Sequence, residues 1–382
     1  GKIEDGLPRW HLALRDKEYA AIDEALTQPG VHFVPNTRVG RDVELQALTD
    51  DWGFQAVVLA NGAWRDRPLP IEGSDAYVGK GLVYQNPFIH WFNHYLETGY
   101  SGEHYEIMDG TAIIGGGLAS IDVAKVVQLE LALRALAKRG IEEDLVRTEV
   151  KGIPETLKRH GLTWEELGLK GVTLYYRRRI EDMPLVEIPE SANEARREKI
   201  AKTRTRLLDK AISKYLFHVE PLHAPVGLLT EGDRLDGLRF ARTRVEAGRV
   251  SLTEETVDVR APMVISSIGS IPEALPGIAM RGELYDFVDW ELGLLEAYPS
   301  LFSVGNVVTG KGNIVSSRKH SRLVARSVVE EYIRVADVVK QLPPLASGQR
   351  EEILDRVREL QTRIGYSGNY REWIDHTIPH VP

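Results

Sequence analysis

The stretch TAIIGGGLAS, residues 111–120, decides the fold of this chain. Its first four residues form a short apolar run of the kind found in buried strands. The run leads directly into three glycines, and a helical pattern follows from about residue 118 to residue 138. A strand that passes through a glycine-rich turn into a helix opens the parallel α/β sheets that bind dinucleotides. The sequence therefore predicts a Rossmann-like domain around this unit.

The spacing within the turn indicates what it binds. Glycine permits the tight turn and the close backbone approach, and the free amides at the helix start stabilise a pyrophosphate. Serine at the third position of the motif is the variant expected with a phosphorylated nicotinamide cofactor. The alternative is a plain strand-to-helix turn, because many turns use glycine. The candidate cofactor-binding residues here are Gly115, Gly117, Leu118, Ala119 and Ser120.

Three consecutive arginines follow the next apolar run, GVTLYY, residues 171–176. In a dinucleotide fold, an acid at the end of this strand binds the adenosine ribose, whereas arginine accommodates a 2′-phosphate. We assign Arg177 and Arg178 to that phosphate and favour NADP(H) over NAD(H), because guanidinium forks match phosphate geometry. The distance from the glycines fits if the polar helical stretch 140–170 is an insertion. The alternative is a solvated loop whose arginines are neutralised by the acids that follow them.

Composition limits the remaining choices. A chain of 382 residues is longer than one hydrophobic core usually organises, so two domains, or one domain inserted in another, are expected. The net charge of −8 gives no reason to expect a nucleic acid or an acidic membrane as partner. The sequence contains no cysteine, which excludes disulfides, thiol redox pairs and cysteine-held metal clusters within it. No apolar run approaches the roughly 20 residues needed to cross a bilayer, and we expect a cytoplasmic protein.

Apolar periodicity predicts the other elements. Strands are expected at residues 30–34, 56–60, 263–268 and 301–304, and an antiparallel ribbon at 235–245 and 250–259. Helices are expected at residues 19–26, 88–95, 194–215, 316–339 and 349–363.

Several motifs together resemble a known family. The run Tyr176-Arg177-Arg178, followed by Met183-Pro184 and preceded by the GGGLAS turn, resembles the NADPH site of the glutamate synthase small subunit and adrenodoxin reductase group of flavoproteins. GLPRW (6–10), NTRVGRD (36–42) and LANGA (59–63) are similar in order and spacing to the flavin domain of that group. FSVGN (302–306), continued through residues 310–314, resembles its closing flavin motif.

The resemblance implies a Rossmann-like NADPH domain inserted into an FAD-binding Rossmann-like domain. It predicts an FAD-type domain at residues 1–105 and 273–342, an NADPH domain at 106–272 with the helical insertion 140–170, and a C-terminal helical tail at 343–382. Each flavin position has an alternative explanation as a glycine turn after a buried strand. The further candidate cofactor residues are Asn61, Gly62, Gly269, Gly305, Asn306, Gly312, Asn313 and Ile314.

The beginning of the chain departs from the family. The related flavoproteins open with their own strand, GxGxxG turn and helix, which cradle the FAD pyrophosphate, and nothing before Gly6 supplies this unit. We therefore expect the natural polypeptide to extend upstream, and FAD binding depends on that extension. Otherwise a second copy of the chain, as a homo-oligomer, or another subunit would complete the flavin half.

The resemblance also implies the reaction. A hydride would pass from NADPH to FAD, and electrons would then leave to an iron–sulfur partner such as ferredoxin or a glutamate-synthase-like subunit, with no catalytic side chain required. The alternative is a non-catalytic nucleotide-binding or assembly subunit, or a truncated flavoprotein fragment.

Two weaker features complete the candidates. His90 and His94 are four residues apart on one predicted helix, a metal-binding spacing without a third ligand nearby, so packing among aromatic residues is favoured and no metal site is expected. The basic helix at 194–215 could dock an acidic electron carrier, but charge runs are usually solvated faces.

Overall fold

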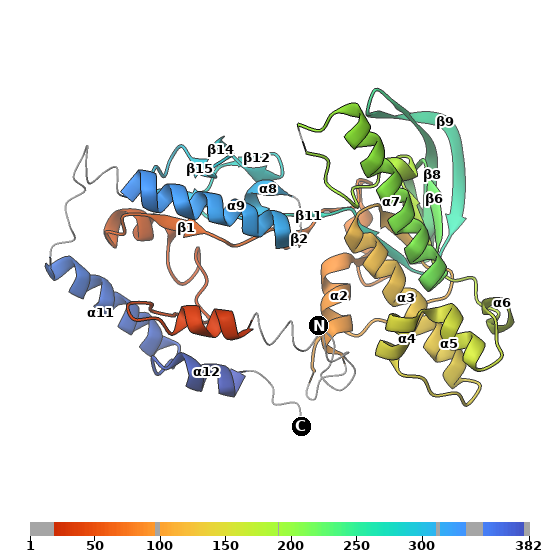
Figure 1. Cartoon of the computed structure of the whole chain (residues 1–382), viewed down its shortest axis with the longest axis horizontal. Helices are drawn as coiled ribbons and strands as arrows, with labels where there is room; N and C mark the ends of the chain where they lie inside the picture. Colours follow the sequence, from red (N-terminus) through yellow and green to blue (C-terminus); the bar gives the residue numbers. More distant parts are fainter. Residues whose placement is uncertain (1–18, 96–99, 190, 311–313, 334–346, 378–382) are drawn as a thin grey trace. The chain divides into compact units, whose positions relative to one another are not determined.

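The chain forms two compact units. The computed structural model describes residues 19–95, 100–189, 191–310, 314–333 and 347–377. The first unit consists of the described residues between 66 and 269, and the second of those in 19–65 and from 270 onward. The first unit is therefore inserted in the second along the sequence, as the colours of Figure 1 show. The predicted class, an α/β fold with one domain inserted in another and helices at the C-terminal end, is confirmed.

A five-stranded parallel sheet forms the centre of the first unit. Its strands lie in the order β3 (Leu82–Tyr84), β10 (Val264–Ser267), β4 (Ala112–Gly115), β5 (Thr173–Tyr176) and β6 (His218–Pro221). Every neighbouring pair is parallel, so all carboxyl ends lie at one edge of the sheet. Successive side chains point to opposite faces, so both faces of this apolar sheet need a cover.

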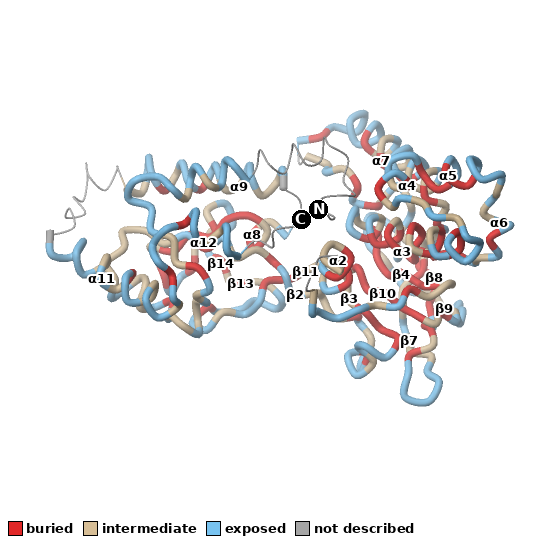
Figure 2. Tube along the Cα trace, turned by 90° about the horizontal axis from the view of Figure 1, so that it is seen from below, coloured by how far each residue is buried: buried red, intermediate tan, exposed pale blue. Residues whose placement is uncertain are grey.

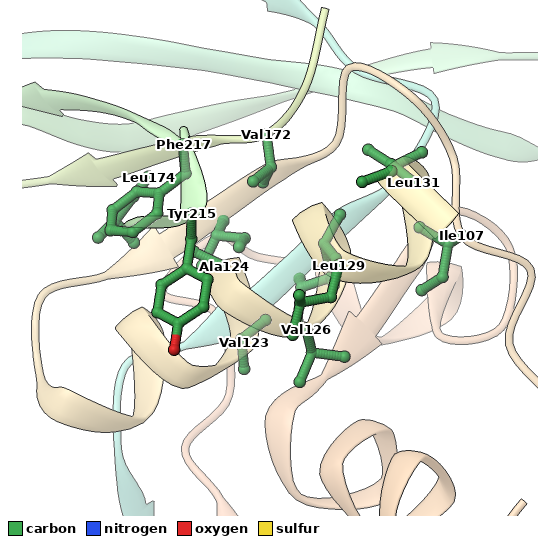
Figure 3. Close-up of a cluster of buried hydrophobic side chains, with 14 of the residues drawn as sticks. Ile107, Val123, Ala124, Val126, Leu129, Leu131, Val172, Leu174, Tyr215 and Phe217 are labelled. Carbon is green, nitrogen blue, oxygen red and sulfur yellow. The ribbon is translucent and has the colours of Figure 1, made fainter. Parts of the chain in front are cut away.

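Helices cover one face. They are α2 (Gln85–His94), α3 (Leu118–Ala137) and α7 (Glu194–Tyr215). Ile113 of β4 and Leu174 of β5 pack there with Val127 and Leu129 of α3, all four fully buried. Figure 3 shows this cluster, in which Tyr215 lies beside Ala124 of α3 and Phe217 lies beside Leu174 of β5. Burial of each large apolar side chain contributes about 1.5–3 kcal/mol, so this layer holds α3 firmly against the sheet.

An antiparallel ribbon covers the opposite face. It consists of β7 (His223–Glu231), β8 (Arg234–Glu246) and β9 (Arg249–Arg260). Ile114 and Tyr175 of the sheet pack against Leu238 and Phe240 of β8, and the Tyr175 and Phe240 rings stack with centroids 4.4 Å apart. β4 and β10 are therefore buried on both sides, as Figure 2 shows in red. β7 was missing from the sequence prediction, because it contains Pro225 and Gly227, residue types that are depleted in strands.

The insertion between β4 and β5 is helical, as predicted. It contains α4 (Leu145–Lys151), α5 (Ile153–Arg159) and α6 (Trp164–Leu167). Thr163 and Glu166 form a capping box at the start of α6, with the Thr163 amide donating to the Glu166 carboxylate at 2.7 Å. Such reciprocal bonds satisfy two helix-end amides and fix where the helix begins.

The second unit is built around a parallel pair, β1 (Val57–Leu59) and β16 (Leu301–Ser303). β2 (Arg65–Asp66), within which the division between the units falls, pairs with β11 (Ser270–Ile271). The remaining pairs are β12 (Met280–Arg281) with β13 (Leu284–Tyr285), and β14 (Phe287–Asp289) with β15 (Leu294–Leu295). The helices are residues 19–26, α8 (Asn306–Thr309), α9 (Ile314–Ser327), α11 (Ser347–Arg363) and α12 (Tyr370–Thr377), with short turns η2 (Ala47–Asp51) and η5 (Val328–Ile333). First-unit turns are η3 (Ser74–Tyr77) and η4 (Ile180–Asp182).

Two predicted elements differ from the structure. The strand expected at residues 30–34 is wrong, because residues 31–34 have no ladder partner among the described residues. Phe33 instead contacts three aromatic rings near the C-terminal end, with centroids 5.2–5.9 Å away, at Tyr366, Tyr370 and Trp373. The helix expected at 316–339 changes to a π-helical turn after Ser327, and residues 334–339 lie outside the described residues.

The boundary of the inserted unit lies earlier than residue 106. β3 pairs with β10 and therefore belongs to the central sheet of the first unit, which begins at Asp66. Within the described ranges, no helix has the length and apolar character needed to span a bilayer.

Candidate functional site

The carboxyl edge of the first unit's sheet brings together three segments that are distant in sequence. Ser267 of β10 lies opposite Gly115 of β4, and Tyr175 of β5 lies opposite Ile114. Because the strands are parallel, Gly115–Gly117, Tyr176–Arg178 and Ser267–Gly269 follow the sheet at the same edge. In open α/β sheets, ligands bind at this edge.

Each of the three positions in the turn requires glycine for a different physical reason. A side chain at Gly115 would overlap the Ser267 carbonyl and the Ser120 hydroxyl, and one at Gly116 would overlap the Tyr176 ring. At Gly117, by contrast, no atom of the described residues lies within 4 Å of where a Cβ would be. The first two glycines therefore permit packing within the protein, and Gly117 leaves open space above the turn.

The start of α3 is suited to an anion. Gly117 is the N-cap residue and provides no side-chain cap, and the first turn contains no acidic residue. Leu118 and Ala119 are exposed. The first amides of a helix have no partner within the helix, and the helix dipole adds partial positive charge. A 20-residue helix with uncapped amides beside open space therefore fits a phosphate group.

Ser120 has an internal role. Its side chain is fully buried, and its hydroxyl donates to the Ser267 carbonyl at 3.0 Å. The Ser267 hydroxyl in turn donates to Gln85 Oε1, at the start of α2. These bonds connect α3 and α2 to β10, so the Ser120 side chain helps to hold the glycine turn in place. Direct cofactor contact by Ser120 stays a prediction.

The three arginines have different partners. Both side-chain nitrogens Nε and Nη2 of Arg179 donate to the Asp182 carboxylate, at 3.0 and 3.1 Å. Arg178 donates from Nη1 to the Gly248 carbonyl at 2.9 Å. Arg177 is exposed, and within the part of the chain that the structure describes its guanidinium makes no hydrogen bond or ion pair. Of the cluster, Arg177 is thus fully available to an anion, and Arg178 retains unused donors.

A half-buried carboxylate that the sequence did not reveal lies near the same edge. Both oxygens of Asp66 accept the Asn86 backbone N–H at 3.2 Å, at the start of α2. Burial raises the pKa of Asp66 to about 6, and the Asn86 bond opposes that shift. Its partner lies 20 positions away in sequence, so no local motif could have indicated it.

The predicted flavin positions lie in the second unit, where β1 and β16 are parallel and end together. The Asn61 amide Nδ2 donates to the Tyr285 hydroxyl at 3.0 Å, whereas Asn61 Oδ1 is buried without a partner among the described residues. Gly305 has a φ of 77° and donates its N–H to His320 Nδ1 at 3.1 Å. Gly62 also has a positive φ, of 67°, and Asn306 begins α8.

The rest of the flavin candidates are only partly visible. Gly312 and Asn313 lie outside the described residues, as does the side chain of Ile314 and the GLPRW motif at 6–10. Gly269 belongs to the first unit, at the end of β10, with a φ of 102°. Its carbonyl accepts the Arg67 N–H at 3.0 Å.

The two weaker candidates are also placed. The rings of His90 and His94 lie 4.5 Å apart on α2, and no group of three or more metal-binding side chains occurs within the described ranges. On α7, most basic residues are exposed, but Arg204 is buried and donates to the carbonyls of Val186 and Glu181. Arg204 therefore anchors the loop after the arginine cluster rather than forming part of a docking face.

The fold and this edge define a class: α/β proteins with one Rossmann-like unit inserted within another. The solved structure of Mycobacterium tuberculosis FprA in complex with NADPH has this fold, with a TM-score of 0.64 over 90% of this chain and 78% of that one, at 17% identity. That likeness establishes the fold alone.

Sequence relatives carry the comparison further. The Arabidopsis thaliana protein named mitochondrial NADPH:adrenodoxin oxidoreductase is 27% identical over 325 residues, which cover 75% of this chain and 65% of the relative. The small chain of Bacillus subtilis NADPH glutamate synthase is 34% identical over 116 residues, 30% of this chain and 22% of the relative. The chain thus matches less than two thirds of these relatives, and no family model matches it. The resemblance to the glutamate synthase small subunit and adrenodoxin reductase group is confirmed.

Proposed function

We propose that this chain belongs to an NADPH-dependent flavoprotein oxidoreductase that passes electrons from NADPH through FAD to an iron–sulfur protein. The observation that carries the proposal is the carboxyl edge of the first unit's sheet. There an uncapped helix start faces open space at Gly117, and the Arg177 guanidinium has no partner among the described residues. The relatives named above are NADPH enzymes, which supports the same cofactor for this chain.

The residues of the first unit would hold NADP(H) by charge and hydrogen bonding. The amides at the start of α3 would receive the pyrophosphate, and the guanidinium groups of Arg177 and Arg178 would receive the 2′-phosphate. Gly117 would admit the pyrophosphate because it lacks a side chain. When bound, NADPH supplies a hydride to FAD, whose ring can then release electrons one at a time.

The residues of the second unit would hold part of the flavin. Asn61 Oδ1, just after β1, is a buried acceptor without a donor among the described residues. It could accept a hydrogen bond from a ribityl hydroxyl or another donor. The positive φ of Gly62 and Gly305 lets the backbone turn sharply after each parallel strand. The resemblance to the glutamate synthase small subunit and adrenodoxin reductase group supports an iron–sulfur protein as the partner that receives the electrons.

The experiment is titration of the purified chain with NADP⁺ and NAD⁺ by calorimetry. Arg177→Ala removes one charge-assisted contact with the 2′-phosphate, worth about 1.5–3 kcal/mol, so NADP⁺ affinity should fall roughly ten- to a hundred-fold. NAD⁺ affinity should stay unchanged. If Arg177→Ala binds both nucleotides as the wild type does, the proposal is wrong.

A matched control uses the neighbouring arginine. The double variant Arg179→Ala with Asp182→Asn removes an ion pair as a unit and keeps the net charge. Because Arg179 is already occupied by Asp182, this variant should bind NADP⁺ within about threefold of the wild type.

Absorbance of the purified protein tests the flavin. A yellow preparation with stoichiometric flavin that NADPH bleaches would support the oxidoreductase. NADP⁺ binding by a colourless protein that also fails to take up added FAD would favour the alternative, a non-catalytic nucleotide-binding subunit.

A further inference from the structure

The loop that carries Arg177 and Arg178 is fastened to the antiparallel ribbon. The Thr243 hydroxyl, on β8, donates to the Arg177 carbonyl at 2.9 Å. The Leu222 N–H donates to the Arg178 carbonyl at 3.1 Å, and the Thr243 N–H donates to the Leu222 carbonyl at 2.9 Å. Two consecutive carbonyls of the loop are thus held by a pair of residues that are bonded to each other.

The backbone at both attachment points departs from regular strand geometry. Leu222 has a φ of 59°, a left-handed conformation that non-glycine residues rarely adopt and that costs free energy. The register of β8 against β9 shifts between Ala241 and Thr243. Irregularities of this kind re-aim side chains and are frequent beside binding sites. Here the shift ends at Thr243, whose hydroxyl bonds the Arg177 carbonyl.

The attachment at Thr243 is buried. Thr243 is only 6% exposed, so its hydroxyl is largely shielded from water that would compete for the bond. A ring cluster lies alongside, in which His223 contacts Tyr175 and Phe240 edge-on at 5.7 and 5.9 Å. The tip of the same ribbon provides the Gly248 carbonyl that accepts from the Arg178 guanidinium.

We propose that Thr243 is a positioning residue for selection of NADP(H) over NAD(H). By holding the Arg177 carbonyl, it fixes the position of the loop that carries the guanidinium groups of Arg177 and Arg178 at the sheet edge. The inference rests on the proposed function, since it concerns the same 2′-phosphate. It adds that selectivity depends on the ribbon as well as on the arginines themselves.

Isosteric variants of the full chain test the proposal. Thr243→Val keeps the shape but lacks the hydroxyl, whereas Thr243→Ser keeps the hydroxyl. Calorimetric titration with NADP⁺, NAD⁺ and 2′,5′-ADP should show that valine weakens NADP⁺ and 2′,5′-ADP binding about threefold to tenfold, the range for loss of one hydrogen bond. NAD⁺ affinity should not change, and serine should restore NADP⁺ affinity to within twofold.

The ratio of the two affinities separates positioning from mere stability. A purely structural loss would weaken NAD⁺ and NADP⁺ equally, and this result would overturn the proposal. The proposal would also be overturned if Thr243→Val left the ratio of NADP⁺ affinity to NAD⁺ affinity unchanged while Arg177→Ala reduced it. That result would leave the proposed function standing. A wild-type chain without preference for NADP⁺ would overturn both. If valine prevents folding, Thr243→Ala is used with the same expectation.

Discussion

At the scale of single residues, the glycine turn shows what a motif does and does not specify. The spacing of Gly115, Gly117 and Ser120 indicated one ligand-binding turn, and the structure separates their roles. Gly115 and Gly116 are required by Ser267 and Tyr176, whereas Gly117 faces open space. A motif gives the positions that need glycine, but only the neighbours from other strands show whether the ligand or the protein needs it.

These roles predict opposite outcomes for two adjacent substitutions. Gly117→Val should still fold, with a small loss of stability because valine is a poorer N-cap than glycine. It should lose at least about a hundred-fold in NADP⁺ affinity, because its side chain would fill the space of the pyrophosphate. Gly116→Val should instead lower stability by about 1–3 kcal/mol or more, because it overlaps the Tyr176 ring. Circular dichroism melts and NADP⁺ titration measure both effects. Retained NADP⁺ affinity in folded Gly117→Val would show that the turn binds something else.

Asp66 predicts a pH dependence of stability. Its folded-state pKa is raised from 3.8 to about 6, so the folded chain holds this proton more tightly than the unfolded chain does. Its contribution to stability is therefore complete below about pH 4 and is lost as pH rises through about 6. Asp66→Asn keeps an acceptor for the Asn86 N–H and has no charge to bury. We expect this variant to be more stable than the wild type at pH 7 and no more stable at pH 4.

Urea unfolding at pH 4 and pH 7 measures this difference. The control is Asp233→Asn, since the Asp233 side chain is 80% exposed and pairs with Lys80 at the surface. Its effect on the urea midpoint should be small at both pH values. An equal change for Asp66→Asn at the two pH values would contradict the assigned pKa.

At the scale of elements, local signals predicted most of the first unit and fewer parts of the second. The helix at 194–215 has the same bounds as α7, because Asn193 caps it and its apolar positions repeat regularly. The ribbon strands β8 and β9 were also expected. The failed strand at 30–34 had the right apolar residues, but Phe33 packs against rings more than 300 positions away. The anchors Asp66 and Thr243 were missed for the same reason, since long-range partners leave no local pattern.

The tip of the ribbon predicts a stabilising substitution. Ala247 and Gly248 connect β8 to β9 as a two-residue loop, and both have positive φ, 47° and 76°. This combination is the type I′ hairpin turn, which strongly prefers Asn-Gly. Ala247→Asn should therefore raise stability by roughly 0.5–1 kcal/mol, because asparagine tolerates the left-handed region better than alanine. The urea midpoint of unfolding measures this gain.

The same variant has an internal check. Gly248 keeps its carbonyl for Arg178, so NADP⁺ affinity should not fall in Ala247→Asn. By contrast, Ala247→Val adds a β-branched residue at a positive φ and should destabilise the hairpin. A valine variant as stable as the asparagine variant would show that the turn conformation is not that of the structure.

At the scale of the whole molecule, each hydrophobic core belongs to one unit. The clusters around α3 and around Phe240 draw on residues between 66 and 269, and those around Tyr285 and Phe302 on residues of the second unit. Because the two units have separate cores, we expect a substitution in one core to change the stability of that unit alone. Sequence length suggested two cores, but the point of division at residue 66 depended on the pairing of β3 with β10, which periodicity cannot show.

This division predicts that core damage stays within one unit. Leu129→Ala, on α3, and Leu301→Ala, on β16, each truncate a fully buried side chain and should cost about 2–5 kcal/mol. Hydrogen exchange followed by mass spectrometry should show faster exchange of β4 and β5 in the first variant, with β1 and β16 unaffected. The second variant should show the reverse. Saturating NADP⁺, at about a hundred times its Kd, should restore about 2.7 kcal/mol to the first unit alone. If either substitution accelerates exchange in both units equally, the two cores unfold as one.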